Sequence, residues 1–115
     1  MTVIVGNPRK RNKYRNKPTG GFASKKEAAR YAELLLLQSA GEIRNLRTQV
    51  RYEIIPKQDG ERAAHYVADF VYDTPIGGWD VQMTVVEDAK GFRTADYVLK
   101  RKLMLHVHCI RIQEV

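Results

Sequence analysis

The sequence predicts an α/β domain with the element order α-β-β-β-α-β, and three patterns carry this prediction. Apolar residues recur at helical spacing over 24–40 and again after Thr94. Residues 46–55 alternate between apolar and mostly polar side chains, as in a strand with one solvated face. A Gly77-Gly78 pair separates two further apolar runs, where a hairpin would need positive φ. At 115 residues, the chain has the size of one domain.

The first helix and the second strand have clear signals. Ser24 is followed three residues later by Glu27, which is the spacing of a capping box, and the helix is expected to stop near Ala40-Gly41. The second strand, at 65–72, is apolar on both faces apart from Asp69. Such a strand is expected in the centre of a sheet.

The second half of the chain predicts a strand, a helix and a last strand. The third strand spans 81–90, and Thr94 is a suitable N-cap for a helix over 96–105. Residues 107–114 are expected to close the chain as an apolar strand. On that strand, Cys109 is interpreted as a small core residue.

The positive charge is concentrated at the N-terminus. The chain has a net charge of +7, and residues 1–20 contain six basic residues and no acid. The six are Arg9, Lys10, Arg11, Lys13, Arg15 and Lys17. We therefore expect a basic flexible arm at 1–20 and a folded domain at 21–115. Such an arm suits phosphate backbones, where binding releases counterions, although a solubilising tail has the same composition.

Several classes of function are disfavoured. The sequence has no apolar run of about 18 residues and no apolar signal segment near its start, so we expect no membrane partner and a cytoplasmic protein. A single cysteine excludes an internal disulfide. His106 and His108 alternate on the last predicted strand, but without a third ligand nearby they are a weak signal for zinc.

A short charged motif ends the third predicted strand. Residues two apart on a strand point to the same face, so Asp88 and Lys90 share a face. Glu87 points to the opposite face, where we expect a solvated or paired acid.

The hairpin decides whether Asp69 joins this motif. If the loop is centred on Gly77-Gly78, Ile76 faces Trp79 and Asp69 falls opposite Val86. Asp69 would then lie on the face of the third strand that carries the Asp-x-Lys charges. An odd-length loop or a bulge would break this parity.

The order of these motifs resembles the core of the PD-(D/E)xK nuclease superfamily, with Ala68 in place of the usual proline before the first acid. More closely, the chain resembles a phage-encoded family of small members of that superfamily, related to resolvase-like and transposase-end nucleases. The matching segments are 12–17, 24–28, 68–72 and 86–92. The resemblance implies a restriction-endonuclease-like core, with a mixed central sheet flanked by helices.

The resemblance also implies Mg²⁺-dependent hydrolysis of phosphodiester bonds, with Mn²⁺ as a substitute metal. Asp69 and Asp88, with the Ala89 carbonyl, would bind the metal, and Lys90 would orient or help deprotonate the attacking water. A structural Asp–Lys ion pair is the alternative. Glu27 would bind the metal or position water, unless it serves only as the capping-box acid.

Other residues are weaker candidates. Glu87 is the alternative ligand if a bulge rotates its strand. Basic residues on or before the second helix could hold phosphates, or form only a solvated basic face. They are Arg93, Lys100 and Lys102. Gln49 and Tyr97 could line the rim of the site, and Trp79 could stack on a base, contact another subunit or pack within its loop.

The leading hypothesis is therefore a Mg²⁺-dependent DNA endonuclease of a phage, acting in the bacterial cytoplasm. Kinship suggests branched or structured DNA, as for Holliday junction resolvases, and a homodimer is expected if paired cuts are made. The alternatives are a non-catalytic nucleic-acid-binding module with the same fold, and a purely structural phage protein.

Overall fold

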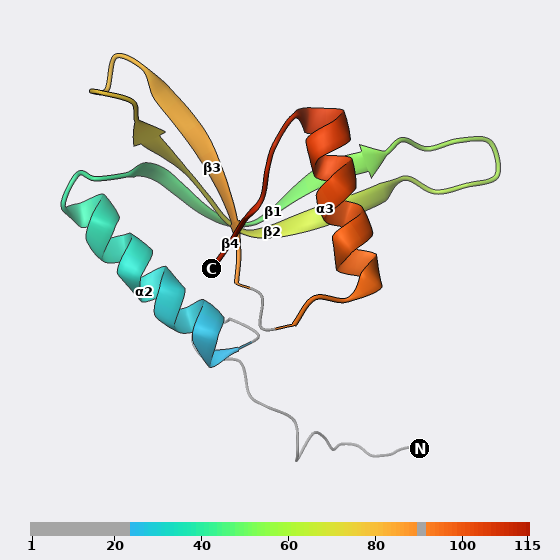
Figure 1. Cartoon of the computed structure of the whole chain (residues 1–115), viewed down its shortest axis with the longest axis horizontal. Helices are drawn as coiled ribbons and strands as arrows, with labels where there is room; N and C mark the ends of the chain where they lie inside the picture. The colour runs from blue at the N-terminus through green and yellow to red at the C-terminus, as the bar shows by residue number, and fades with distance from the viewer. Residues whose placement is uncertain (1–23, 90–91) are drawn as a thin grey trace, which may run out of the picture.

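A computed structural model describes residues 24–89 and 92–115 as two helices and four strands (Figure 1). The elements in chain order are α2 (Lys25–Ser39), β1 (Arg44–Ile55), β2 (Ala64–Pro75), β3 (Gln82–Asp88), α3 (Ala95–His108) and β4 (Gln113–Glu114). The predicted order α-β-β-β-α-β is confirmed. No helix in the described ranges is long and apolar enough to cross a membrane.

The four strands form one mixed sheet in the order β1-β2-β3-β4. The pairs β1/β2 and β2/β3 are antiparallel, whereas β3 and β4 are parallel. The connection from β3 to its parallel neighbour passes through α3, as a parallel pair requires a crossover. The chain is thus an α/β domain with a mixed sheet between two helices (Figure 1).

Both predicted N-caps start their helices. The Ser24 hydroxyl accepts a hydrogen bond from the Glu27 amide (3.1 Å), and the Thr94 hydroxyl accepts one from the Tyr97 amide (3.0 Å). Each cap has an extended backbone and satisfies one of the amides that a first helical turn leaves without a partner.

Two apolar clusters fill the two sides of the sheet. The α3-side cluster consists of Ile54, Tyr66, Ala68, Val71, Val86, Tyr97, Met104 and Ile112. The α2-side cluster consists of Leu34, Ile43, Phe70 and Tyr72. In Figure 1 the two helices accordingly lie on different sides of the strands.

β1 and β2 exchange faces at one level of the sheet. Ala68 belongs to the α3-side cluster and Phe70 to the α2-side cluster, although residues two apart share a face in a regular strand. On β1, Leu46 packs on the α2 side and Val50 on the α3 side. Gln49 lies at this level with a left-handed backbone (φ 53°), which is uncommon outside glycine. The face change therefore coincides with a local backbone irregularity.

The predicted register of the β2–β3 hairpin is wrong by two residues. The Ile76 amide bonds to the Val81 carbonyl (2.7 Å), so Ile76 does not face Trp79, and Val86 pairs with Val71 rather than with Asp69. The loop still has an even length, so the predicted parity holds. The Arg44 guanidinium lies 4.0 Å from the centroid of the Trp79 ring, which is a cation–π contact within the domain.

The predicted last strand is also wrong for most of its length. Helix α3 continues to His108, so His106 and His108 lie on a helix, and only Gln113–Glu114 forms a strand. Cys109 is exposed and caps the helix with a left-handed backbone (φ 58°), rather than packing in the core. A helical period and a strand alternation are hard to separate in a short apolar segment.

Candidate active site

Asp69, in the middle of β2, lies beside Asp88, the last residue of β3, where the pairing of these two strands ends. The β2–β3 pairing reaches Phe70 and Glu87, so one further step along the same register brings Asp69 to Asp88. The Asp69 carboxylate accepts a hydrogen bond from the Ala89 amide (2.8 Å). This bond holds the Asp69 side chain against the residue that follows Asp88.

Tyr66 joins this carboxylate pair from the α3 side. Its hydroxyl donates a 2.6 Å hydrogen bond to Oδ2 of Asp88, and both side chains are buried. Burial, followed by the hydrogen bond to Asp88, raises the pKa of Tyr66, and the charges of Asp88 and Asp69 add to the rise. The Tyr66 hydroxyl is therefore a permanent donor near neutral pH.

The sequence did not identify Tyr66 as a site residue. Tyr66 stands three positions before Asp69, and strand alternation places such residues on opposite faces. Only the face change between Ala68 and Phe70 puts the tyrosine beside Asp88. No residue pattern in the strand signals that change.

Glu27 of α2 reaches strand β1 of the sheet. Its carboxylate is 7% exposed and accepts a 2.9 Å hydrogen bond from Nε2 of Gln49. Gln49 lies between the pairs Thr48/Phe70 and Val50/Ala68, a place in the β1–β2 register that corresponds to Asp69. Ser24 caps the helix, while the Glu27 side chain turns to β1. Glu27 is thus connected through Gln49 to the level of Asp69.

Glu87 points to the opposite side of the sheet from Asp88, as predicted, but it is buried and paired. Nε and Nη2 of Arg30 donate hydrogen bonds to its two carboxylate oxygens, at 2.8 and 2.7 Å. The Tyr72 hydroxyl also donates a hydrogen bond to Oε2. The bond to Glu87 raises the pKa of Arg30, and burial followed by the bond to Glu87 raises the pKa of Tyr72 to about 12. These bonds occupy Glu87 on the α2 side, which argues against its alternative role as a metal ligand.

A further acid lies beside Asp88 on the neighbouring strand β4. Glu114 of β4 is the register partner of Asp88, and the Val115 amide bonds to the Asp88 carbonyl (3.0 Å). The Glu114 carboxylate accepts hydrogen bonds from Arg93 Nε (2.7 Å), the Tyr97 hydroxyl (2.8 Å) and Arg101 Nη1 (3.3 Å). Arg93 first, then Tyr97, lowers the pKa of Glu114 to about 2.

The Glu114 contacts were missed because they depend on where α3 ends. The predicted strand at 107–114 gave no reason to bring Glu114 to the side chains of the second helix. Tyr97, predicted at the rim, does lie here, and its pKa is raised by burial first and then by the bond to Glu114, with a further rise from the Asp88 charge. Tyr97 is thus close enough to Asp88 to feel its charge.

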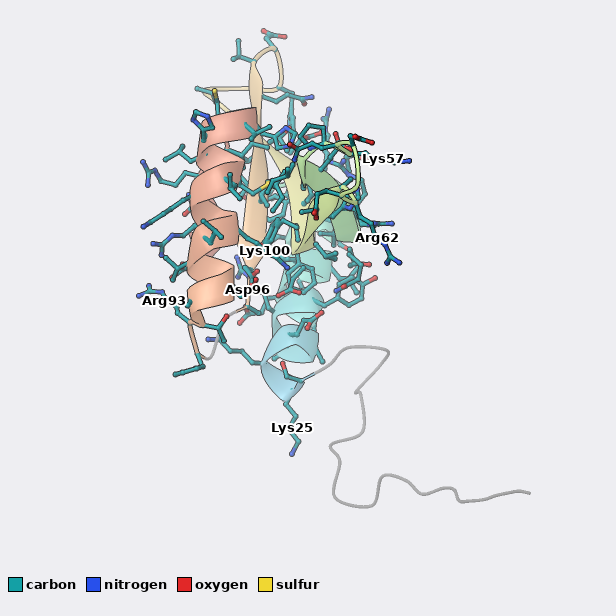
Figure 2. The ribbon with its side chains drawn as sticks, turned by 90° about the vertical axis from the view of Figure 1, so that its right-hand side faces the viewer. Lys25, Lys57, Arg62, Arg93, Asp96 and Lys100 are labelled. Carbon is teal, nitrogen blue, oxygen red and sulfur yellow. The ribbon has the colours of Figure 1, made fainter. Side chains whose placement is uncertain are left out.

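The predicted basic contacts divide into two groups. Lys90 and the arm residues Arg9, Lys10, Arg11, Lys13, Arg15 and Lys17 lie outside the described residues. Of the others, Arg93 binds Glu114, Lys100 forms an i,i+4 ion pair with Asp96 (3.3 Å), and Lys102 is exposed on α3. Figure 2 shows Arg93 and Asp96 at the start of that helix.

The oxygen donors fit a small hard cation. Asp69 and Asp88 are joined through Ala89, and Mg²⁺ is commonly held by one or two carboxylates together with water and substrate phosphate. In the described part of the chain, no group of three or more His, Cys, Asp or Glu side chains is placed to hold a metal.

Fold and site together define an α/β domain in which a carboxylate pair lies on the two central strands of a mixed sheet. Residues 11–113 match the model of a family described as "Protein of unknown function (DUF1064)". The chain belongs to this family. No curated protein and no solved structure matches it.

Proposed function

We propose that this protein is a Mg²⁺-dependent DNA endonuclease with a restriction-endonuclease-like core. The observation that carries the proposal is the Asp69–Asp88 pair, tied together by the Ala89 amide at 2.8 Å. Two neighbouring carboxylates on the central strands are costly in free energy, because Asp88 is buried and Asp69 is partly buried. Such a cost is common at sites that bind a cation.

Asp69 and Asp88, with the Ala89 carbonyl, would hold the ion, and Mn²⁺ would replace Mg²⁺. When bound, such an ion polarises a phosphoryl oxygen and lowers the pKa of a bound water. The hydrogen bond from Tyr66 holds one Asp88 oxygen in place, which leaves the carboxylate with a defined orientation. A metal ion at the site would therefore bind an Asp88 carboxylate whose orientation is already fixed.

The remaining groups act on water and on the DNA. The Glu27 carboxylate, held by Gln49, can accept a proton from a water molecule beside Asp69. Lys90, two residues after Asp88, would orient the attacking water and offset the charge that develops on the transition state. The basic residues of 1–20 would bind the phosphate backbone without reading sequence.

The substrate that fits the resemblance is branched or otherwise structured DNA of a phage, cut in the cytoplasm of the bacterial host. Paired cuts would require two sites, and hence a homodimer.

The decisive experiment measures cleavage of linear, nicked, flapped and four-way DNA, with Mg²⁺ or EDTA. Asp88→Asn and Asp69→Asn keep the side-chain shape and remove the negative charge, and Asp59→Asn in an exposed turn is the charge-matched control. We expect Mg²⁺-dependent cleavage by the wild type and by the control, and a loss of at least about 100-fold in each site variant.

DNA binding measured in EDTA and with Mg²⁺, for the wild type and Asp88→Asn, separates this proposal from its main competitor. A non-catalytic nucleic-acid-binding module would bind DNA in a salt-dependent manner, would ignore Mg²⁺, and would be unaffected by Asp88→Asn. The absence of cleavage on every substrate, or equal cleavage by Asp88→Asn and the wild type, would show that the proposed site is wrong.

A further inference from the structure

A pocket of about 270 Å³ lies between α3 and the segment that leads into β4. Its lining residues are Arg101, Lys102, Leu105, Arg111, Ile112 and Glu114. Three of the six are permanently cationic side chains from two separate segments, and Leu105 and Ile112 supply apolar wall. An apolar wall lowers the local dielectric constant and strengthens the attraction of these cations for an anion.

The single acid of the pocket is ionised, but its charge is already paired with Arg93 and Arg101. The Glu114 carboxylate already accepts hydrogen bonds from Arg93, Tyr97 and Arg101, which lower its pKa to about 2. Lys102 and Arg111 form no ion pair with any residue in 24–89 or 92–115. Lys102 and Arg111 are therefore the two pocket cations that no acid of the described residues neutralises.

The pocket is a neighbour of the carboxylate pair. Glu114 is the register partner of Asp88, and Val115 bonds to the Asp88 carbonyl at 3.0 Å. The pocket wall and the candidate metal ligand are thus on adjacent strands of the sheet.

We propose that this pocket binds one phosphate group of the DNA backbone, close to the phosphate that is cleaved. The inference rests on the proposed function, and it adds Arg111 to the DNA-binding residues, beside Lys102. The guanidinium fork of arginine matches two phosphate oxygens, and the lysine adds a point charge. Such a contact positions the strand at Asp88 and reads no bases.

The first test is DNA binding by the full chain in EDTA, where no hydrolysis occurs. Lys102→Gln/Arg111→Gln removes two exposed pocket cations, and Lys57→Gln/Arg62→Gln removes two exposed cations on the β1–β2 turn. In Figure 2 the labelled Lys57 and Arg62 lie away from α3, on the far side of the strands. Both variants lose the same charge, so any difference between them reports position.

We expect the pocket variant to bind a fluorescein-labelled DNA duplex about tenfold more weakly than the control variant. The slope of log affinity against log salt concentration should fall by about one more than in the control. Circular dichroism should show equal folding, because all four substituted residues are exposed. Lys102→Gln alone serves if the double variant is less stable. Equal losses in both double variants would refute the pocket.

The second test replaces one phosphate at a time by an uncharged methylphosphonate in a four-way DNA junction, whose branch point gives the protein a fixed register. At one position the replacement should weaken wild-type binding about tenfold, and it should change binding by the pocket variant by less than about twofold. If no position shows this dependence on Lys102 and Arg111, the pocket does not hold a backbone phosphate. Because both tests measure binding in EDTA, failure of the pocket leaves the Mg²⁺-dependent cleavage by Asp69 and Asp88 intact, and the reverse also holds.

Discussion

The strongest stability prediction concerns the buried pair of Arg30 and Glu87. Glu87 is only 2% exposed, and Arg30 donates to both of its oxygens. Arg30→Leu leaves the Glu87 charge buried, with the Tyr72 hydroxyl as its remaining donor. Removing one partner of a buried ion pair costs roughly 3–5 kcal/mol. The Arg30 side chain is 26% exposed, so water can replace part of it, and we expect about 3 kcal/mol.

A combined variant tests the physical reason for this loss. Arg30→Leu/Glu87→Leu/Tyr72→Phe removes all three polar partners together, so no charge or hydroxyl stays buried without its partner. Hydrophobic replacement of a whole buried ion pair is often neutral. We therefore expect the triple variant to lie within about 1 kcal/mol of the wild type, and to be more stable than Arg30→Leu.

Urea denaturation measures both variants. A slope of roughly 1–3 kcal/mol per molar urea converts the loss of about 3 kcal/mol into a midpoint about 1–3 M lower for Arg30→Leu. A loss under about 1 kcal/mol for Arg30→Leu would refute the reasoning, because the buried charge would then have found another partner. A triple variant as unstable as Arg30→Leu would refute it as well.

Two further predictions concern α3. Thr94→Ala removes the hydroxyl that accepts from the Tyr97 amide, and should cost about 1 kcal/mol of unfolding free energy in urea, whereas Thr94→Ser should cost much less. The second concerns Glu114, whose pKa is lowered from an ordinary 4.5 to about 2. Its bonds to Arg93 and Arg101 therefore stabilise the fold fully above pH 4.5. This stabilisation is lost as the pH falls towards 2 and the carboxylate is protonated. Urea midpoints should therefore fall less steeply from pH 4.5 to pH 2 in Glu114→Gln than in the wild type, and equal slopes would contradict the role of this carboxylate.

The sequence predicted the elements that have their own local signals. Ser24 and Thr94 are side chains that cap a helix whatever the rest of the fold does, and both start helices at the expected places. The end of α3 has no such signal, since Cys109 adopts a left-handed backbone without being glycine or asparagine. The apolar residues around it therefore suited a strand as well as a helix. The missed helix end also hid the contacts of Glu114.

The candidate site was predictable where strand alternation alone decides it. Asp88 and Glu87 point to opposite faces, as the two-residue period requires. The register could not be read in the same way, because the loop takes six residues between its paired strands rather than the shorter turn that the glycine pair suggested. Tyr66 depends on the face change beside Gln49, which involves both strands at once. The pairing of β1 with β2 produces this face change, and neither segment has a sequence pattern that predicts it.

The two helices differ in the amount of buried apolar contact that holds each of them to the sheet. Among the described residues, the α2-side cluster has four buried members and the α3-side cluster has eight. Local opening follows the amount of buried apolar contact, so α2 should exchange its amide hydrogens sooner than β2 or β3. Each opening of α2 would carry Glu27 away from Gln49 while Asp69 and Asp88 stay joined through Ala89. Glu27, the third acid of the candidate site, is therefore on the helix with the smaller apolar cluster, and the ion pair between Arg30 and Glu87 also holds that helix to the sheet.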